Sequence, residues 1–314
     1  MRIAIVGAGA VGGYYGTRLA QHGGDVHFLL RSDYEHVRDK GIEIYSVDGD
    51  FILSPARIHT YNNVKKMPRA DLVLVTLKTT ANDQLARLVP PLIHDHTIVL
   101  TLQNGLGNED ALAQHIGPER VLGGMAFVCI NRIAPGVLEH TERGIIKVGE
   151  LTPGVTQRVR AIVELFTRSN INSEPIEDLR RGRWEKLVWN IPFNGLGALH
   201  DATTDRLLST PQGEALVRAV MAEVVAAAAG NGANLDPDVI DRMIEVTRPI
   251  PAYRTSTQVD RQLGRPMEIE AMFGEPFRAA QKAGVPTPRL HHLYDALTRL
   301  NGAQAGSSQA ARPY

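Results

Sequence analysis

The segment Ile3-Ala-Ile-Val-Gly-Ala-Gly-Ala-Val-Gly12 decides the fold of the first half of this chain. It starts with four apolar residues, passes through three glycines spaced as G-x-G-x-x-G, and opens a helix-like run. A run that is apolar at every position predicts a strand covered on both faces. A strand, a glycine turn and a helix in this order predict a dinucleotide-binding unit.

Each glycine of this turn has its own expected role. Gly7 allows the tight turn, Gly9 lets the backbone approach a pyrophosphate, and Gly12 lets helix and strand pack closely. The helix start then offers free N–H groups and a positive dipole end to the phosphates. The expected cofactor-binding residues here are Gly7, Ala8, Gly9, Ala10, Val11 and Gly12. The alternative is a glycine-rich turn without a ligand.

Working outward, short apolar runs alternate with helical patterns. The runs lie near 26–30, 72–75 and 98–100, and the helical patterns near 10–22, 79–88 and 108–115. This alternation predicts a parallel sheet with crossover helices. Residues 43–60 alternate and contain Asp48-Gly49, which predicts a small antiparallel excursion. Two or three further strands are expected within 120–149, a helix near 155–168 and an extended segment near 171–176.

From about residue 179 strand signals nearly vanish. Helices are expected near 179–199, 212–230, 236–247, 250–264, 268–283 and 288–301. The expected class is α/β: a Rossmann-type NADP-binding domain over 1–178, then an all-helical substrate and catalytic domain over 179–314. The chain's 314 residues suit two domains of about 150 residues each.

Composition is that of an ordinary globular protein, with 43% hydrophobic and 22% charged residues. Lys plus Arg equals Asp plus Glu, at 34 each, so charge gives no reason to expect nucleic acid or an anionic membrane. The one cysteine, Cys129, permits no intrachain disulfide. No apolar run approaches the roughly 20 residues that span a bilayer. A cytoplasmic protein is expected, and the oligomeric state, a homodimer included, stays open.

The end of the second strand selects the cofactor. An NAD-specific site usually has Asp or Glu there, to hold the ribose 2′-hydroxyl. This chain has Arg31-Ser32-Asp33, and a guanidinium suits a 2′-phosphate through charge and its bidentate fork. We therefore expect NADPH. In the alternative, Arg31 is a surface side chain and Asp33 is the ribose ligand.

Polar residues also follow two other strands. Lys78 comes after Leu72–Leu77, and Asn104-Gly105 comes after Ile98–Gln103. Ligands of open α/β sheets bind beyond the carboxyl ends of the strands. Lys78 could hold a phosphate or a carboxylate, and Asn104 the nicotinamide carboxamide or the substrate. The alternatives are a solvated loop lysine and an ordinary Asn-Gly turn.

In the helical half, Lys186, Asn190 and Asn194 fall at i, i+4 and i+8 on one apolar helix. Asparagine is a poor residue for a helix interior, and buried amides must find partners. A ligand with a carboxylate and hydroxyls would supply them; a polar stripe between helices is the alternative. Pro192 is expected to kink this helix. Glu268 is a candidate carboxylate, although carboxylates on helices are usually solvated.

The whole chain to about Leu300 resembles the ketopantoate reductase (2-dehydropantoate 2-reductase) family. The resemblance rests on the glycine turn, on Leu77-Lys78 and Gln103-Asn104-Gly105, and on Trp184-Glu-Lys186 with the two asparagines. It also rests on Ser256, on Gly264-Arg-Pro-Met-Glu268 and on Gly284-Val-Pro-Thr-Pro288. Taken together these motifs are specific, whereas no single one is.

The resemblance implies NADPH-dependent reduction of ketopantoate, a small 2-keto acid, with Lys186 as proton donor. It implies substrate contacts from Asn104, Asn190, Asn194, Thr204 and Ser256. It implies that Glu268 contacts the substrate hydroxyl or the cofactor, and that Lys78 and Asn104 also contact the cofactor. No metal is implied.

Two departures from the family pattern put the keto acid in doubt. The string Ser256-Thr-Gln-Val-Asp260 stands where members commonly have a Ser-Met-Leu-Gln-Asp-like one, and Pro192 separates the two asparagines. A reductase of another 2-keto acid or of an imine is therefore one alternative. A sensor that binds a dinucleotide without turnover is another, against which Lys186 and Glu268 argue.

Overall fold

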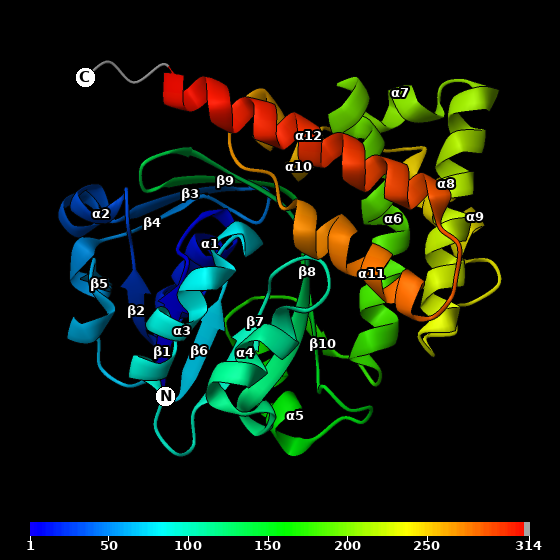
Figure 1. The fold of residues 1–314 in the computed structure, drawn as a ribbon. Coiled ribbons are helices and arrows are strands. Elements are labelled where there is room, and N and C mark those ends of the chain that lie inside the picture. Colours follow the sequence, from blue (N-terminus) through cyan, green and yellow to red (C-terminus); the bar gives the residue numbers. More distant parts are fainter. Residues whose placement is uncertain (311–314) are drawn as a thin grey trace. The chain divides into compact units, whose positions relative to one another are not determined.

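The computed structural model describes residues 1–310, without the side chains of residue 143 and of residues 304–310. The last four residues of the domain expected over 179–314 thus lie outside the described residues. The chain forms two compact units (Figure 1). The first comprises Met1–Gln103 and Asn108–Leu179, and the second comprises Asn104–Gly107 and the chain from Arg180 onward. The four-residue excursion at 104–107 was not part of the division expected from the sequence.

The first unit is built on one mixed sheet in the order β4-β3-β9-β8-β7-β6-β1-β2-β5, with β10 paired to β9. The strands are β1 (Arg2–Val6), β2 (Asp25–Leu29), β3 (Ile42–Ser46), β4 (Phe51–Leu53), β5 (His59–Tyr61), β6 (Leu72–Val75), β7 (Ile98–Thr101), β8 (Val121–Ala134), β9 (Val137–Gly149) and β10 (Ser173–Pro175). The path from β5 through β2, β1, β6 and β7 to β8 is parallel throughout. Counted along the chain, this is the 3-2-1-4-5-6 order of dinucleotide-binding folds. The expected Rossmann-type architecture is confirmed.

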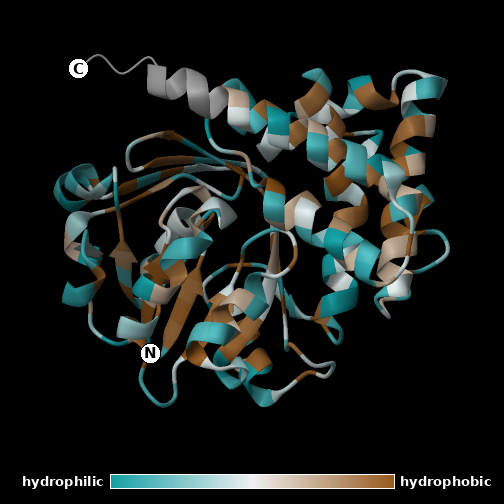
Figure 2. Ribbon diagram, in the orientation of Figure 1, coloured by the Kyte–Doolittle hydropathy of each residue, from teal (hydrophilic) through white to brown (hydrophobic). Residues whose placement is uncertain are grey.

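Helices cover both faces of this sheet, and successive side chains of the central strands point to opposite faces. The helices are α1 (Ala10–Gln21), α2 (Tyr34–Lys40), α3 (Leu85–Leu88), α4 (Asn108–Ile116) and α5 (Gln157–Arg168). Ile3 and Ile5 of β1 pack with α1 and α5, whereas Ala4 and Val6 pack with α3 and α4. All four side chains are fully or almost fully buried. The apolar strands appear as brown ribbons in Figure 2.

Three local expectations in this unit need correction. The excursion expected to be antiparallel over 43–60 is so only for β3 and β4, because β5 pairs in parallel with β2. Helix α2 was not expected, although Asp33 before it and Gly41 after it are ordinary helix boundary residues. The helix expected over 79–88 is largely a 3₁₀ segment, η3 (Thr79–Gln84), before the four residues of α3.

The second unit consists of helices in the part of the chain that the structure describes. They are α6 (Leu179–His200), α7 (Thr204–Leu208), α8 (Pro211–Gly230), α9 (Val239–Thr247), α10 (Ser256–Gln262), the π-helix η6 (Glu270–Gly274), α11 (Glu275–Lys282) and α12 (Pro288–Ala310). Buried residues of α6, α8, α11 and α12 form its core. Helix α6 continues through Pro192 as one element. The helix expected over 250–264 was too long, and α7 was not expected. Together, η6 and α11 cover nearly all of the helix expected over 268–283.

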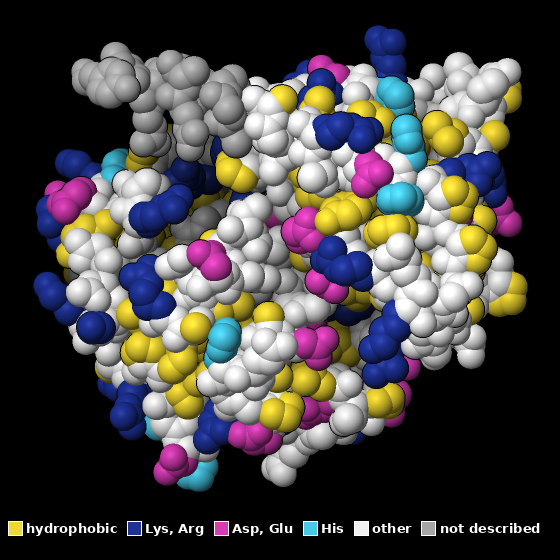
Figure 3. Space-filling view, in the orientation of Figure 1, with side chains coloured by type: hydrophobic (Ala, Val, Ile, Leu, Met, Phe, Trp, Pro, Cys, Tyr) yellow, Lys and Arg dark blue, Asp and Glu magenta, His cyan; other side chains and the backbone are white. Residues whose placement is uncertain are grey.

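Charges of both signs are interspersed on the face drawn in Figure 3. This agrees with the equal numbers of basic and acidic residues. Among the described helices, none combines the length and the apolar character that a bilayer crossing requires.

Candidate active site

The turn after β1 requires glycine at two positions for steric reasons. Gly7 has a φ of +102°, and a Cβ there would lie 2.4 Å from the backbone nitrogen of Leu77. A Cβ on Gly12 would lie 2.2 Å from the Thr76 Oγ1 and 2.6 Å from the Gly7 carbonyl oxygen. Contacts this short cannot be relieved without moving backbone, so both glycines are demanded by the packing of β1, α1 and the segment after β6.

Gly9 differs, because no described atom apart from its own neighbours along the chain lies within 4 Å of where its Cβ would be. It is the N-cap residue of α1, which has neither a side-chain cap nor an acidic residue in its first turn. The first N–H groups of a helix lack intrahelical partners and carry partial positive charge. The turn thus presents open backbone donors suited to an anion. Ala8, Ala10 and Val11 lie in the same turn, and their contact with a cofactor stays a prediction.

Arg31 is exposed just beyond β2, and it forms no ion pair with any described residue. Asp33, by contrast, is buried and fully engaged. Its carboxylate accepts from the Ser32 hydroxyl at 2.7 Å, from the Gly136 N–H at 3.3 Å and from the Arg132 guanidinium. Burial alone would raise the pKa of Asp33, but these three donors hold it below its ordinary value. The arrangement argues against Asp33 as a free ribose ligand.

Arg132 was missed by the sequence analysis. It lies on β8, donates to the Ser32 hydroxyl at 3.1 Å and pairs with Asp33. Its separation of about a hundred positions from these partners left no local signal. Arg132 therefore engages the carboxylate of Asp33, two positions after Arg31.

Lys78 is exposed and precedes η3. Its neighbour Leu77 supplies the backbone against which Gly7 packs. Lys78 therefore follows directly the segment that closes the glycine turn, in the same unit. Its contact with a cofactor or substrate stays a prediction.

In the second unit, Lys186 of α6 donates a hydrogen bond to the Asn104 side-chain carbonyl, at 2.9 Å. Asn104 is held there by its own loop. Gly105 has a φ of +89°, a Cβ on it would lie 2.2 Å from the Ala271 carbonyl oxygen, and that oxygen accepts the Leu106 N–H at 2.9 Å. The short loop thus packs on η6, and two predicted site residues from distant parts of the sequence come together.

The amine of Lys186 lies in a strongly perturbing environment. Burial lowers its pKa to about 7, with a further lowering from the Arg183 cation and an opposing effect from the Glu268 carboxylate. A lysine with a pKa near neutrality can both give and take a proton at physiological pH. Two predicted catalytic residues, Lys186 and Glu268, are therefore electrostatically coupled.

The two asparagines of α6 are both buried but differ in their partners. Asn194 uses its carbonyl oxygen to accept from the Thr257 hydroxyl at 3.0 Å, from the Thr257 N–H and from the Ser256 hydroxyl, both at 3.3 Å. This caps the start of α10. For Asn190, no hydrogen-bond partner is found among the described residues. A buried amide without a protein partner is a position at which a ligand can bond.

Thr204, which the resemblance places at the substrate, begins α7 and is buried. Its hydroxyl finds no hydrogen-bond partner in the described structure. Ser256 is exposed at the start of α10, and Glu268 is half-buried just before η6. The substrate roles of these residues stay predictions.

The comparisons with known proteins cover nearly the whole chain. The sequence profile described as "Ketopantoate reductase PanE/ApbA" matches residues 3–153, and the one described as "Ketopantoate reductase PanE/ApbA C terminal" matches residues 178–301. A 2-dehydropantoate 2-reductase of a Nostoc species is 43% identical over 306 residues, covering 96% of this chain and 95% of the relative.

Solved structures give the same result. The crystal structure of 2-dehydropantoate 2-reductase from Geobacter metallireducens is 43% identical, with a TM-score of 0.92, and the match covers 95% of this chain and 99% of that one. A complex of D-mandelate dehydrogenase with NADH and anilino(oxo)acetate has a TM-score of 0.90, over 97% of this chain and 100% of that one. At 22% identity this second likeness shows the fold alone.

Proposed function

This chain belongs to the ketopantoate reductase family of dinucleotide-binding oxidoreductases, and from that premise we propose that it reduces ketopantoate to pantoate with NADPH, using Lys186 as proton donor. The observation that carries the proposal is the Lys186 amine, bonded to Asn104 at 2.9 Å and with a pKa lowered to about 7. A structural surface lysine would keep a pKa near 10.4.

The first unit offers features that suit the phosphates of NADPH. The backbone is open at Gly9 and the start of α1 carries no acidic group, which favours a pyrophosphate there. Arg31 has no carboxylate partner among the described residues, whereas the carboxylate of Asp33 is engaged by Arg132. A 2′-phosphate is better matched to the Arg31 guanidinium than a 2′-hydroxyl. These features support NADPH over NADH.

When bound, the reduced nicotinamide supplies the hydride that reduces the keto carbon. Addition of hydride leaves negative charge on the keto oxygen, and the Lys186 ammonium stabilises that charge and donates the proton that completes the alcohol. The carbonyl of Asn104 fixes the direction of the amine. Glu268, by opposing the lowering of the Lys186 pKa, keeps a larger fraction of the amine protonated.

Substrate orientation falls to amides and hydroxyls of the second unit in this proposal. Asn190 has its amide free of protein partners among the described residues, and the NH₂ group of Asn194 remains available while its carbonyl caps α10. These groups, with the Ser256 and Thr204 hydroxyls, suit a carboxylate and a hydroxyl. Holding both ends of a small keto acid lowers the entropic part of the barrier.

The proposal is tested by purified protein with NADPH and ketopantoate, following the absorbance of the reduced nicotinamide. We expect turnover with ketopantoate to exceed that with 2-ketoisovalerate, pyruvate, phenylglyoxylate and a cyclic imine. Faster turnover of another keto acid or of an imine would identify that compound, and not ketopantoate, as the substrate. Cofactor binding without oxidation on any of them would favour the sensor alternative and overturn the proposal.

The cytoplasmic location and the homodimer also remain proposals. Light scattering on the purified protein tests the second, and a mass equal to one 34.3 kDa chain would contradict it.

A further inference from the structure

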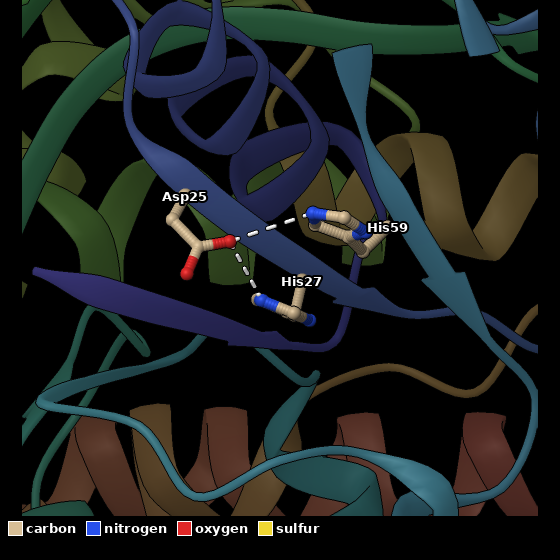
Figure 4. Close-up of side chains that lie close together, drawn as sticks. All are labelled: Asp25, His27 and His59. Atoms are coloured by element: carbon tan, nitrogen blue, oxygen red, sulfur yellow. Dashed lines mark hydrogen bonds and ion pairs between the residues drawn. The ribbon is translucent and has the colours of Figure 1, made fainter. Parts of the chain in front are cut away.

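Three side chains of metal-ligating types gather on β2 and β5, in the first unit (Figure 4). Asp25 and His27 are two positions apart on β2, so they point to the same face of the sheet. On the neighbouring strand His59 stands in register with His27. The sheet geometry itself therefore brings two imidazoles and one carboxylate together.

The donor atoms of these three side chains converge. The Asp25 Oδ1 lies 2.9 Å from the His27 Nε2 and 3.5 Å from the His59 Nε2. All three potential ligand atoms lie within 4.8 Å of one another. The two imidazole rings stack with centroids 4.4 Å apart and an interplanar angle of 17°.

Each of the two less exposed ligand groups has an orienting partner. The other ring nitrogen of His27, Nδ1, lies 3.1 Å from the Tyr61 hydroxyl, and the second carboxylate oxygen of Asp25 accepts from the Arg2 Nε at 3.1 Å. Such partners fix the ring or carboxylate and raise its suitability as a ligand. The Arg2 cation opposes a second cation nearby, but it leaves the Oδ1 atom facing the two histidines.

We propose that Asp25, His27 and His59 form a binding site for one divalent transition-metal ion, Zn²⁺ foremost, that links β5 to β2. Two imidazoles and one carboxylate are a ligand set that zinc uses when a fourth position is left to water. The side chains of Asp25 and His59 are 41% and 58% exposed, so water can reach that position. Mg²⁺ prefers oxygen ligands and is a poor match.

The place of the cluster in the sheet indicates a structural role. Strand β5 has three residues and lies at the edge of the sheet. Asp25 is in register with Arg2, at the start of β1. The glycine turn lies beyond the other end of β1, after Val6. Four residue steps separate the two ends of that strand, about 13 Å at ~3.3 Å per step. The ion would therefore stabilise the edge strand, at the end of β1 away from the glycine turn.

The test is a zinc titration of chelator-treated full-length protein by isothermal calorimetry, with thermal unfolding measured alongside. We expect one equivalent of Zn²⁺ per chain and a higher Tm in Zn²⁺ but not in Mg²⁺, because a ligand that binds only the folded state stabilises it. His59→Gln and Asp25→Asn should bind at least about tenfold more weakly, since loss of even an outer-shell partner costs that much.

Two matched variants separate this site from scattered surface histidines. His115→Gln removes an exposed imidazole of α4 outside the cluster and should leave zinc binding unchanged. Tyr61→Phe removes only the partner of His27 and should weaken binding without changing the stoichiometry. Zinc binding in His59→Gln equal to that of the unaltered protein overturns the proposal, as does the absence of one-equivalent binding. So does equal weakening by His115→Gln.

Discussion

The carbonyl oxygen of Asn104 accepts a hydrogen bond from the Lys186 amine at 2.9 Å, although the two residues are 82 positions apart in sequence. The loop Asn104–Gly107 makes this possible, because it leaves the first unit and packs on Ala271 of η6. The bond fixes the direction of an amine whose pKa is lowered to about 7. Several expected properties of the enzyme depend on this pair.

Replacing Lys186 by alanine should lower kcat with ketopantoate by at least about a hundredfold, the usual scale for loss of a general acid. The side chain removed carries the proton and the charge that stabilises the keto oxygen. Stopped-flow measurement of single-turnover rates isolates the chemical step. Lys282→Ala, at an exposed position of α11, is the control and should behave like the unaltered protein. Near-normal turnover in Lys186→Ala would remove this residue from the mechanism.

The pH dependence of the reaction should follow the Lys186 pKa of about 7. Reduction needs the ammonium form, so kcat/KM for ketopantoate should be level below pH 7 and fall about tenfold per pH unit well above it. Oxidation of pantoate needs the neutral amine and should show the opposite slope. Initial rates across the pH range in both directions are the measurement. A reduction rate that stays level to pH 9 contradicts the assignment.

Neighbouring charges should move this midpoint in opposite directions. The Arg183 cation lowers the Lys186 pKa, so Arg183→Met should shift the alkaline fall of kcat/KM to higher pH. The Glu268 carboxylate raises it, so Glu268→Gln should shift the fall to lower pH. The pH profile separates this effect from a merely structural one, which would lower rates without moving the midpoint. Shifts of the same sign in both variants would refute the coupling.

Much of the first unit was predictable because its elements carry local signals. Strands such as β1 are apolar at every position, and the glycine turn identifies the unit to which they belong. Strand β5 carries no such signal: His59-Thr-Tyr61 is short and partly exposed, and its parallel pairing with β2 depends on chain far from it. Its position could not be deduced from periodicity.

The candidate site likewise combines residues that the local sequence identifies with contacts that it does not. Lys186 and Asn190 were found by their spacing on one helix, a property of the local sequence. Two contacts depend on elements that lie about a hundred positions apart. One is the hydrogen bond from Lys186 to Asn104, and the other is the ion pair between Arg132 and Asp33. Resemblance supplied the residue roles, whereas the three-dimensional arrangement identifies Arg183 and Glu268 as charges that act on the pKa of Lys186.

Two glycines of the same turn should respond differently to alanine. Gly12→Ala brings a Cβ to 2.2 Å from the Thr76 hydroxyl, so the protein should lose about 1–3 kcal/mol of stability, as overpacked sites do. In Gly9→Ala, the new Cβ meets no described atom within 4 Å apart from the neighbours along the chain, so the Tm should stay unchanged. It should nevertheless weaken NADPH binding at least about tenfold, or 1.4 kcal/mol, by keeping the pyrophosphate from the backbone. Fluorescence titration and thermal unfolding of both variants test this pair, and unchanged NADPH affinity in Gly9→Ala would contradict the assigned phosphate site.

Arg31 and Asp33 lie two positions apart in sequence but should control different properties. Arg31→Ala should raise the KM for NADPH at least about tenfold and leave that for NADH nearly unchanged, since only NADPH presents a phosphate to the guanidinium.

Asp33→Asn should instead lower stability by about 1–3 kcal/mol at neutral pH, because it weakens the buried contacts with Ser32, Gly136 and Arg132. The pKa of Asp33 is lowered, so its contribution is present above the ordinary carboxyl value of about 3.9 and is lost as the pH falls through the lowered one. The stability difference between Asp33→Asn and the unaltered protein should therefore shrink in acid. An unchanged NADPH preference in Arg31→Ala, or a changed one in Asp33→Asn, would reverse the assignment of the two side chains.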